Sequence, residues 1–307
     1  MTRSARVITW RGVGAVELCL GDSTVIVVPE LGMLVASFVV NGHEFVARPG
    51  GLASYRAGHT TAVPLLYPWA NRLSRRSYNV GETAVSLRGL ALHTDPNGLP
   101  IHGTMTARPE WEMVALGRGR MRARFDFGAH PDLLASFPFP HVIEVSVTVG
   151  NARLEVTTSV VAHGDAPVPV SFGWHPYWRV PGRRHSWTVE LPDLERVRLD
   201  RRGLPTGSRS HAPAETVALA DHEFDDLFTA AGSRRSVTLH GRGAQLRVDL
   251  DAGYPFLQFY APAGSPFCCL EPMTAPTNAL VTGNHPVVAP GESFHATFVA
   301  SVASPPS

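Results

Sequence analysis

The sequence predicts an all-β fold, a large antiparallel β-sandwich made of two packed sheets. Short stretches in which apolar and polar residues alternate recur along the 307 residues, and a period of two is typical of a strand with one solvated face. The 28 glycines and 26 prolines supply frequent turns. No long stretch has apolar residues at the spacing of a helix face with caps at both ends.

Strands are expected where β-branched residues, aromatic residues or strict alternation are concentrated. Residues 120–127 are the clearest case, because Arg120, Arg122 and Arg124 fall on one face and apolar side chains on the other. Turn-forming pairs such as Asn41-Gly42 separate the stretches. In chain order the expected strands are 24–28, 34–40, 78–87, 120–127, 142–149, 153–160, 245–250, 256–260, 267–270 and 294–302.

The segments between these strands are short. Residues 130–136 and 221–230 are expected to form short helical turns, and the polar residues 201–215 a surface loop. No repeat of fixed period and no linker divides the chain. We therefore expect one domain over residues 1–307, with a core from about residue 20 to 302 and a short disordered tail from residue 304.

Composition excludes several classes of function. The formal net charge of +1 gives no field that would attract nucleic acid or an anionic membrane. All 27 basic residues are arginine, which excludes Schiff-base, pyridoxal-phosphate and P-loop lysine chemistry. Three cysteines, two of them adjacent, do not make a disulfide framework. Because the sequence also has no secretory signal and no membrane-spanning stretch, we expect a cytoplasmic protein.

Polar residues interrupt apolar surroundings at several places, and the first two are Arg72 and His102. Asn71 and Arg72 end the apolar run PLLYPWA, and the rigid guanidinium fork suits ring and hydroxyl oxygens. His102 follows a proline turn and precedes Gly103, which would let the backbone approach a ligand closely. Taken singly, each also fits a structural role, as a loop arginine paired with a carboxylate or a structural histidine.

His175 lies among three large aromatic residues in the segment FGWHPYW. Its pKa lies near neutrality, so it is a candidate general acid. Aromatic faces such as that of Trp178 are suited to the C–H faces of a sugar. The same cluster is also compatible with an aromatic core.

Two acidic segments follow, EFDDLF and CCLEPM. One carboxylate of the first segment, Asp225 or its neighbour Asp226, could accept hydrogen bonds from vicinal hydroxyls. The alternative is a helix cap, for which Asp221 or Asp225 would serve. Glu271 comes at the end of an apolar strand, where partial desolvation raises the pKa of a carboxyl and makes it a better base near neutral pH. The alternative for Glu271 is a structural ion pair with an arginine.

A metal site is the obvious alternative for these polar groups. His102, His175 and Glu271 are far apart in the sequence, and no closely spaced pair of ligands such as H-x-H anchors them. A site of two histidines and one carboxylate stays open as an alternative in an all-β fold. We expect no metal and no other cofactor.

Together these segments resemble the aldose 1-epimerase (galactose mutarotase-like) family. The resemblance covers roughly residues 20–300 and implies a single large β-sandwich with an open cleft across one sheet. It also implies a metal-free reaction that interconverts the α and β anomers of an aldose. The motifs that carry it, in the order of the family, are PWANRLS at Arg72, LPIHG at His102, FGWHPYW at His175, EFDDLF at Asp225 and LEPMTAPTNAL at Glu271.

The resemblance assigns a role to each of these residues. Glu271 corresponds to the general base that removes the anomeric hydroxyl proton, and His175 to the general acid that protonates the ring oxygen. Arg72 and His102 would hold the ring oxygen and neighbouring hydroxyls, and Asp225 would bind hydroxyls on the far side of the sugar. Asn71 and Trp178 are the further residues expected to contact the sugar. The expected partner is a small sugar, and the expected state is a monomer or weak homodimer.

Two related functions stay open. A hexose-6-phosphate 1-epimerase would need a basic cluster for phosphate, and arginines follow both Arg72 and His175 in the sequence. A non-catalytic carbohydrate-binding or regulatory protein would share the fold without the reaction. The candidate phosphate-binding residues are Arg75, Arg76, Arg179, Arg183 and Arg184.

Overall fold

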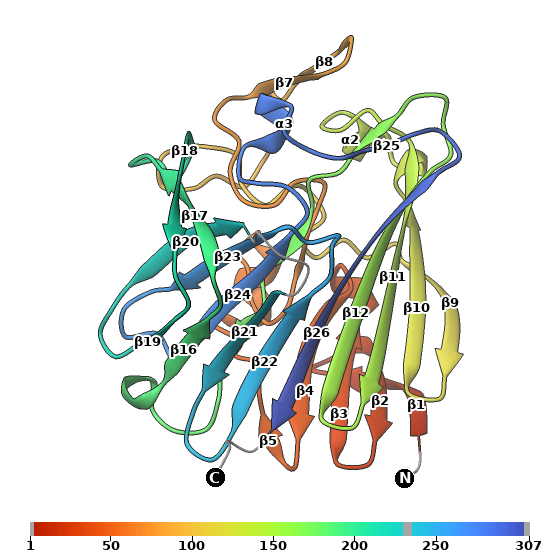
Figure 1. The fold of residues 1–307 in the computed structure, drawn as a ribbon. Helices are drawn as coiled ribbons and strands as arrows, with labels where there is room; N and C mark the ends of the chain where they lie inside the picture. Colours follow the sequence, from red (N-terminus) through yellow and green to blue (C-terminus); the bar gives the residue numbers. More distant parts are fainter. Residues whose placement is uncertain (1–2, 230–234, 304–307) are drawn as a thin grey trace.

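The computed structural model describes residues 3–229 and 235–303, and it forms two layers of antiparallel strands (Figure 1). One layer is a nine-stranded sheet. Its strands, in spatial order, are β19 (Glu215–Ala218), β16 (Thr188–Leu191), β21 (Arg235–His240), β22 (Gln245–Leu250), β26 (Ser293–Ala303), β12 (Arg153–Ala162), β11 (His141–Gly150), β10 (Arg120–Asp126) and β9 (Glu112–Gly117).

The other layer consists of a five-stranded and an eight-stranded sheet, joined at the bridge between Val46 and Trp178. The five-stranded sheet contains β1 (Arg3–Trp10), β2 (Val13–Leu20), β3 (Ser23–Val28), β4 (Leu34–Val40) and β5 (His43–Glu44). The eight-stranded sheet contains β18 (Pro205–Ala212), β17 (Leu194–Leu199), β20 (Phe224–Thr229), β23 (Phe256–Ala261), β24 (Cys268–Met273), β14 (Gly173–Trp174) and β6 (Leu65–Leu66), with β15 (Tyr177–Trp178) also paired to β24.

Short elements connect the layers. Two small ladders pair β13 (Val168–Pro169) with β25 (Val287–Val288) and β7 (Ser77–Val80) with β8 (Thr83–Ser86). The helices are α1 (Gly51–Arg56), α2 (Pro131–Leu134) and α3 (Ala279–Thr282), with 3₁₀ turns η1 (Pro29–Leu31), η2 (Phe127–Ala129) and η3 (Arg184–Ser186). In the described part of the chain, no helix has the length and apolar character needed to cross a membrane.

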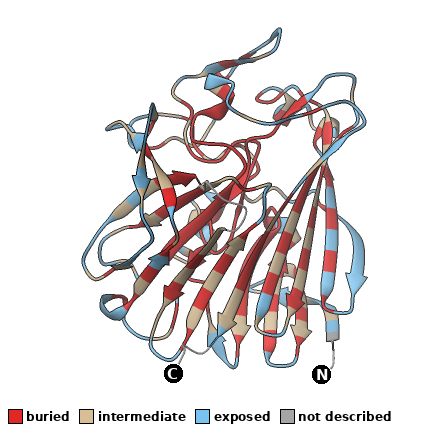
Figure 2. Cartoon of the chain, in the orientation of Figure 1, coloured by how far each residue is buried: buried red, intermediate tan, exposed pale blue. Residues whose placement is uncertain are grey.

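The nine-stranded sheet is built on alternation. Along β11 every second residue is buried and the residues between are partly exposed, and Figure 2 shows the same banding on neighbouring strands. The buried face packs against the other layer, where the Trp174 indole donates a hydrogen bond to Thr158 at 3.0 Å. Burying one face of each strand in this way fixes the register of the sheet, because a slip by one residue would expose that face.

The structure confirms most of the expected strands, with 34–40 and 245–250 matching to the residue. Two predictions were wrong. Residues 78–87 form the hairpin β7–β8 because the chain reverses at Gly81. Residues 224–229, within the expected helical turn, form strand β20, whereas residue 230 lies outside the described residues.

Two further expectations, for residues 201–215 and for the start of the core, also differ from the structure. Residues 205–212, expected in a loop, form the edge strand β18. Its polar, largely exposed residues are equally typical of a surface loop, so the sequence did not distinguish the two. The core begins before residue 20, because Val13, Val16 and Leu18 of β2 are buried in it. Residues 304–307, expected as a tail, lie outside the described residues.

Strand β24 differs from the strands of the nine-stranded sheet. All six of its residues are buried, so both of its faces are covered. Its neighbour β23 pairs with it so that Gln258 lies opposite Glu271 and Tyr260 opposite Cys269. A polar residue in this strand therefore faces either the core or a cavity, and never bulk solvent.

Candidate active site

A cavity of about 540 Å³ opens beside the eight-stranded sheet. Strands β20, β23 and β24 supply one wall, and the loops around residues 59–60, 71–72, 93–96 and 101–102 supply the others. The cavity is within the size range of small-molecule sites. Of the seven expected site residues, it brings together Asn71, Arg72, His102, His175, Asp225 and Glu271.

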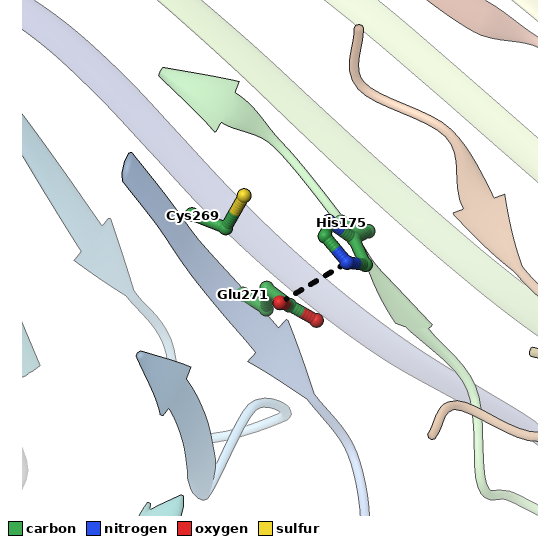
Figure 3. Close-up of side chains that lie close together, drawn as sticks. All are labelled: His175, Cys269 and Glu271. Atoms are coloured by element: carbon green, nitrogen blue, oxygen red, sulfur yellow. Dashed lines mark ion pairs between the residues drawn. The ribbon is translucent and has the colours of Figure 1, made fainter. Parts of the chain in front are cut away.

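His175 and Glu271 form a buried pair in this cavity. The Nε2 atom of His175 lies 3.3 Å from Oε1 of Glu271 (Figure 3), and the residues are 5% and 2% exposed. Close approach of β14 to β24 makes this contact possible. A Cβ on Gly173 would come within 2.7 Å of the Pro272 carbonyl oxygen, so glycine is required there.

The environment shifts the two groups in opposite directions. Burial raises the pKa of Glu271 well above its usual value, and Asp225 adds to this while Arg72 opposes it. Burial lowers the pKa of His175 to about 3. Both shifts favour the uncharged form of the group. Burial therefore favours protonated Glu271 with a neutral His175 imidazole over the ionised pair.

The His102 ring lies next to that pair. Its centroid is 5.5 Å from that of His175, edge to face. The backbone of His102 is in the left-handed region (φ 65°), as is that of Asn71 (φ 57°). Burial, then His175, Arg72 and His93, lower the pKa of His102 well below its usual value, so its ring is neutral near pH 7.

Gly103 was expected to let the backbone approach a ligand, and this stays a prediction. In the structure its backbone closely approaches another part of the chain, since a Cβ there would collide with the backbone of Tyr67. Residues 67 and 103 form a parallel bridge, and residues 72 and 101 an antiparallel one. These contacts hold the His102 and Arg72 segments side by side at the cavity wall.

The Arg72 guanidinium is held by hydrogen bonds at two of its nitrogens. Nε donates to Asp95 at 2.9 Å and Nη1 donates to the Asn71 side chain at 2.9 Å. Nη2 lies 3.9 Å from the Asp225 carboxylate. Burial alone would raise the pKa of Asp95, but hydrogen bonds from the Leu99 amide, Arg72 and Asn97 outweigh it and lower that pKa. Asp95 therefore stays ionised and fixes the arginine.

Gln258 is a polar cavity residue that the sequence analysis missed. Its Nε2 donates to Asp225 at 2.6 Å, and its Oε1 accepts from Asn71 at 3.4 Å. Gln258 is 2% exposed, so these two bonds fix which way its amide points. The alternation in LQFY puts Gln258 and Tyr260 on one face, but only the pairing with β24 shows that this face is the cavity.

The two neighbouring aspartates point to different surroundings. Asp225 lines the cavity, whereas Asp226 pairs with Arg196 at 3.3 Å. Adjacent residues of a strand face opposite sides, which settles the choice that the sequence left open. Burial raises the pKa of Asp225, against the effects of Arg72 and Gln258.

The structure contradicts the expectation for Trp178. Its side chain is 0% exposed in the core and does not line the cavity. In the extended segment after His175, side chains alternate, so Tyr177 faces the cavity and Trp178 the core. The Tyr177 ring stacks on His175 with centroids 4.6 Å apart, and its hydroxyl lies 2.6 Å from that of Thr60.

One cluster could hold a metal ion. Ligand atoms of His175, Cys269 and Glu271 all lie within 4.8 Å of one another (Figure 3). The thiol would have to lose its proton to bind a metal, and burial, Glu271 and Cys268 raise the pKa of Cys269 well above its usual value. The sequence left open a site of two histidines and one carboxylate. The cluster found among residues 3–229 and 235–303 contains one histidine, one cysteine and one carboxylate instead.

The arginines considered for phosphate binding lie outside the cavity lining. Arg76 donates to the carbonyls of Leu87 and Leu90. Arg184 is buried and donates to backbone carbonyls of residues 220, 222, 261, 265 and 267. Those two arginines hold loops together, and of the arginines within residues 3–229 and 235–303 only Arg72 lines the cavity.

The fold and the site define a class of protein. It is an all-β protein with a buried histidine–glutamate contact and hydrogen-bonding groups in a cavity of about 540 Å³. The family model described as aldose 1-epimerase matches residues 15–301, and the chain belongs to that family.

Solved structures share this fold. A galactose mutarotase-like protein from Clostridium acetobutylicum has a TM-score of 0.85 and 19% identity, covering 98% of both chains. Galactose 1-epimerase from Lactobacillus acidophilus NCFM has a TM-score of 0.78 and 13% identity, covering 99% of both chains. An aldose epimerase homologue from C. elegans has a TM-score of 0.76 and 16% identity, covering 99% of both chains. No curated protein sequence matches the chain.

Proposed function

We propose that this protein is an aldose 1-epimerase that interconverts the α and β anomers of a hexose by acid–base catalysis. The observation that carries the proposal is the buried contact of 3.3 Å between His175 and Glu271 in a cavity lined by hydrogen-bonding groups. Such a pair meets the requirement of the reaction, which needs one proton removed at O1 and one delivered at the ring oxygen O5.

In the proposed ring-opening step, Glu271 takes the proton from the anomeric hydroxyl and His175 gives a proton to O5. The O1–H electrons form the C1=O1 double bond, and the electrons of the broken C1–O5 bond go to O5. Rotation about C1–C2 and closure on the other face of the aldehyde give the other anomer. Closure reverses both proton transfers, so each cycle returns the enzyme to its starting state.

The pKa shifts of Glu271 and His175 set the free energy of this proton exchange. Ring opening in this direction starts from the ionised pair, carboxylate and imidazolium, and ends with the uncharged pair. Burial favours the uncharged pair, as the raised pKa of Glu271 and the lowered pKa of His175 indicate. Forming the ionised pair therefore costs free energy, and the proton transfer that opens the ring recovers it by removing two buried charges.

The other cavity residues would hold the sugar. Arg72 and neutral His102 can donate hydrogen bonds to the ring oxygen and nearby hydroxyls, and the Asp225 carboxylate can accept from hydroxyls. Asn71 and Gln258 fix the Asp225–Arg72 side of the cavity. Tyr177, whose ring stacks on His175, lines the cavity in the place that was expected of Trp178.

Anomer exchange measured by NMR saturation transfer tests this proposal. Galactose, glucose and glucose 6-phosphate would be compared in weakly catalytic buffer, with Glu271→Gln as the control variant. Exchange faster with the wild type than with the variant, by about 10²–10⁴-fold, is the expected result. A sugar that binds without faster exchange would instead identify a carbohydrate-binding protein, and a preference for glucose 6-phosphate would identify a hexose-6-phosphate epimerase.

A further inference from the structure

The turn of the β17–β18 hairpin lies against the Arg72 side chain. A Cβ placed on Gly203 in that turn would come within 2.9 Å of Nη1, 3.1 Å of Cζ and 3.4 Å of Nε of Arg72. All three atoms belong to the guanidinium group. Gly203 itself lies outside the cavity lining, whereas Arg72 is part of it. The hairpin therefore meets the candidate site at the back of this one side chain.

Hydrogen bonds within the turn hold Gly203 in place. Its amide donates to the Asp200 carbonyl at 2.9 Å, and the amides of Arg202 and Leu204 donate to the Asp200 carboxylate at 2.8 and 3.0 Å. Gly203 is in the left-handed region at φ 74°, as is common for a glycine that ends a short hairpin loop. The turn requires this backbone conformation, and the contact with Arg72 adds a second requirement, the absence of a side chain.

The base of the hairpin packs beneath the segment that carries Arg72. Val197 of β17 lies in one buried apolar cluster with Leu66 and Ala70, which come shortly before Arg72 in the chain. Strand β17 also pairs with β20, the strand of Asp225 (Figure 1). Because these three segments pack on one another, the fold sets the position of the turn relative to the guanidinium.

Other sides of the Arg72 guanidinium are occupied as well. Nε lies 2.9 Å from Asp95, Nη1 lies 2.9 Å from the Asn71 side chain, and Nη2 lies 3.9 Å from Asp225. A methyl group at position 203 would come closest to Nη1, the nitrogen that donates to Asn71. The guanidinium, as the end of a long side chain, would give way before the backbone of the turn. That shift would disturb its hydrogen bonds to Asn71 and Asp95.

We propose that Gly203 is a positioning residue of the site, which leaves room for the Arg72 guanidinium against the hairpin and so fixes the direction in which it donates hydrogen bonds. This inference rests on the proposed function, in which Arg72 donates to the ring oxygen and hydroxyls of the sugar. The N–H donors of a guanidinium have fixed directions relative to one another. A displacement of the group therefore misdirects all of them together, and small errors in position are costly for catalysis.

Gly203→Ala tests the proposal, with Gly207→Ala as the matched control. Both glycines belong to this hairpin and have a left-handed backbone, at φ 74° and 87°, but a Cβ on Gly207 would meet nothing within 4 Å. Left-handed alanine should lower the melting temperature of both variants by about 2–4 °C. Only Gly203→Ala should lower kcat/KM for anomer exchange of galactose or glucose, by about tenfold to a hundredfold. Gly207→Ala should stay within about twofold of the wild type.

The Arg72→Lys background separates the guanidinium contact from a general distortion of the hairpin. A lysine ammonium is a compact charge without a planar fork, so a methyl group at position 203 has no guanidinium to displace. In that background Gly203→Ala should change kcat/KM by less than about twofold. An equal loss in both backgrounds would overturn the proposal, and so would equal losses for Gly203→Ala and Gly207→Ala.

Failure of the proposed function would give a different result, because no sugar would then exchange faster with the wild type than with Glu271→Gln. The NMR signal of the Arg72 Nε–H group, assigned by its loss in Arg72→Lys, would still decide the role of Gly203. This group donates to Asp95, so its signal reports the position of the guanidinium independently of turnover. Gly203→Ala should shift the signal and Gly207→Ala should leave it in place. A signal that Gly203→Ala does not move would overturn the proposal.

Discussion

Two buried histidines, His141 and His175, lie in different layers of the sandwich, and their surroundings differ. His141 lies on β11 in the nine-stranded sheet, and burial lowers its pKa to about 4. His175 lies beside β14 in the other layer, and burial lowers its pKa to about 3. Burial and the direction of the pKa shift therefore do not distinguish the two residues.

Hydrogen bonding does distinguish them. The Nδ1 atom of His141 lies 2.6 Å from the Phe139 carbonyl oxygen, which can only accept, so Nδ1 carries the proton and Nε2 accepts from the Tyr67 hydroxyl. Nδ1 of His175 has no partner in the described part of the chain, and its Nε2 faces Glu271 in a cavity. A histidine whose two ring nitrogens both have hydrogen-bond partners stabilises the fold, whereas one with a ring nitrogen that has no partner can hydrogen-bond a ligand or exchange a proton with it.

The largest effect that this comparison predicts concerns turnover. His175→Asn should lower the rate of anomer exchange by about 10²–10⁴-fold, because it removes the proposed proton donor to O5. The free energy of unfolding should change little, since the variant keeps the backbone hydrogen bond to Pro64 and the His175 Nδ1 atom has no partner in the described part of the chain. NMR saturation transfer and urea unfolding measure the two quantities. A variant that keeps the full rate would end the proposed role of His175.

The converse variant, His141→Leu, should affect stability instead. It leaves the buried Tyr67 hydroxyl and Phe139 carbonyl without their partner. The free energy of unfolding should fall by about 3 kcal/mol, and the rate of the folded protein should stay within about fivefold of the wild type. A large loss of rate with unchanged stability would reverse the assignment of the two histidines.

The pH dependence of stability gives a smaller effect of known sign. The pKa of His141 is about 4 in the folded protein and about 6.5 in the unfolded chain, so the unfolded chain binds more protons between these values. Stability should therefore decline as the pH falls from about 6.5 to about 4, by at most about 1.4 kcal/mol per pH unit from this residue. Glu271, whose pKa is raised, acts in the opposite direction.

Urea unfolding of wild type and His141→Leu at a series of pH values isolates this contribution. The variant should show a shallower decline in acid, because only the His141 term is removed. Equal slopes for both proteins would mean that the pKa of His141 is the same in the folded protein as in the unfolded chain.

The smallest predicted effect concerns the network beside His175. Gln258→Leu leaves Asp225 and Asn71 without their shared partner and should raise KM for the sugar by about tenfold, with a smaller change in kcat. Gln245→Leu is the matched control, since Gln245 lies on β22 in the nine-stranded sheet. Equal KM values for the two variants would show that Gln258 does not position the sugar-binding groups.

The sequence allowed the strands with strict alternation to be predicted, because one buried face leaves a clear pattern, as in residues 142–149. It did not reveal β18 or β20, whose exposed or mixed faces are decided by their neighbours in the sheet. The site residues with unusual chemical surroundings, such as His175 and Glu271, could be singled out as candidates.

Other cavity residues depended on information that the sequence does not contain. Gln258 lies opposite Glu271 only through the register of two strands. His59 and His93 reach the cavity on loops whose course is set by distant contacts. Trp178 was assigned to the sugar from its residue type, although the alternation of side chains after His175 already placed it on the other face.

The position of β26 in the nine-stranded sheet has a consequence for synthesis on the ribosome. This strand follows every other strand of its sheet in the chain, yet it lies between β22 and β12 near the middle. Strands β9–β12 can pair as they emerge, but they cannot join β22 until residue 303 has left the exit tunnel. Until then β12 and β22 each present an unpaired edge, so the nascent chain is most exposed to aggregation or chaperone capture just before the sheet is completed.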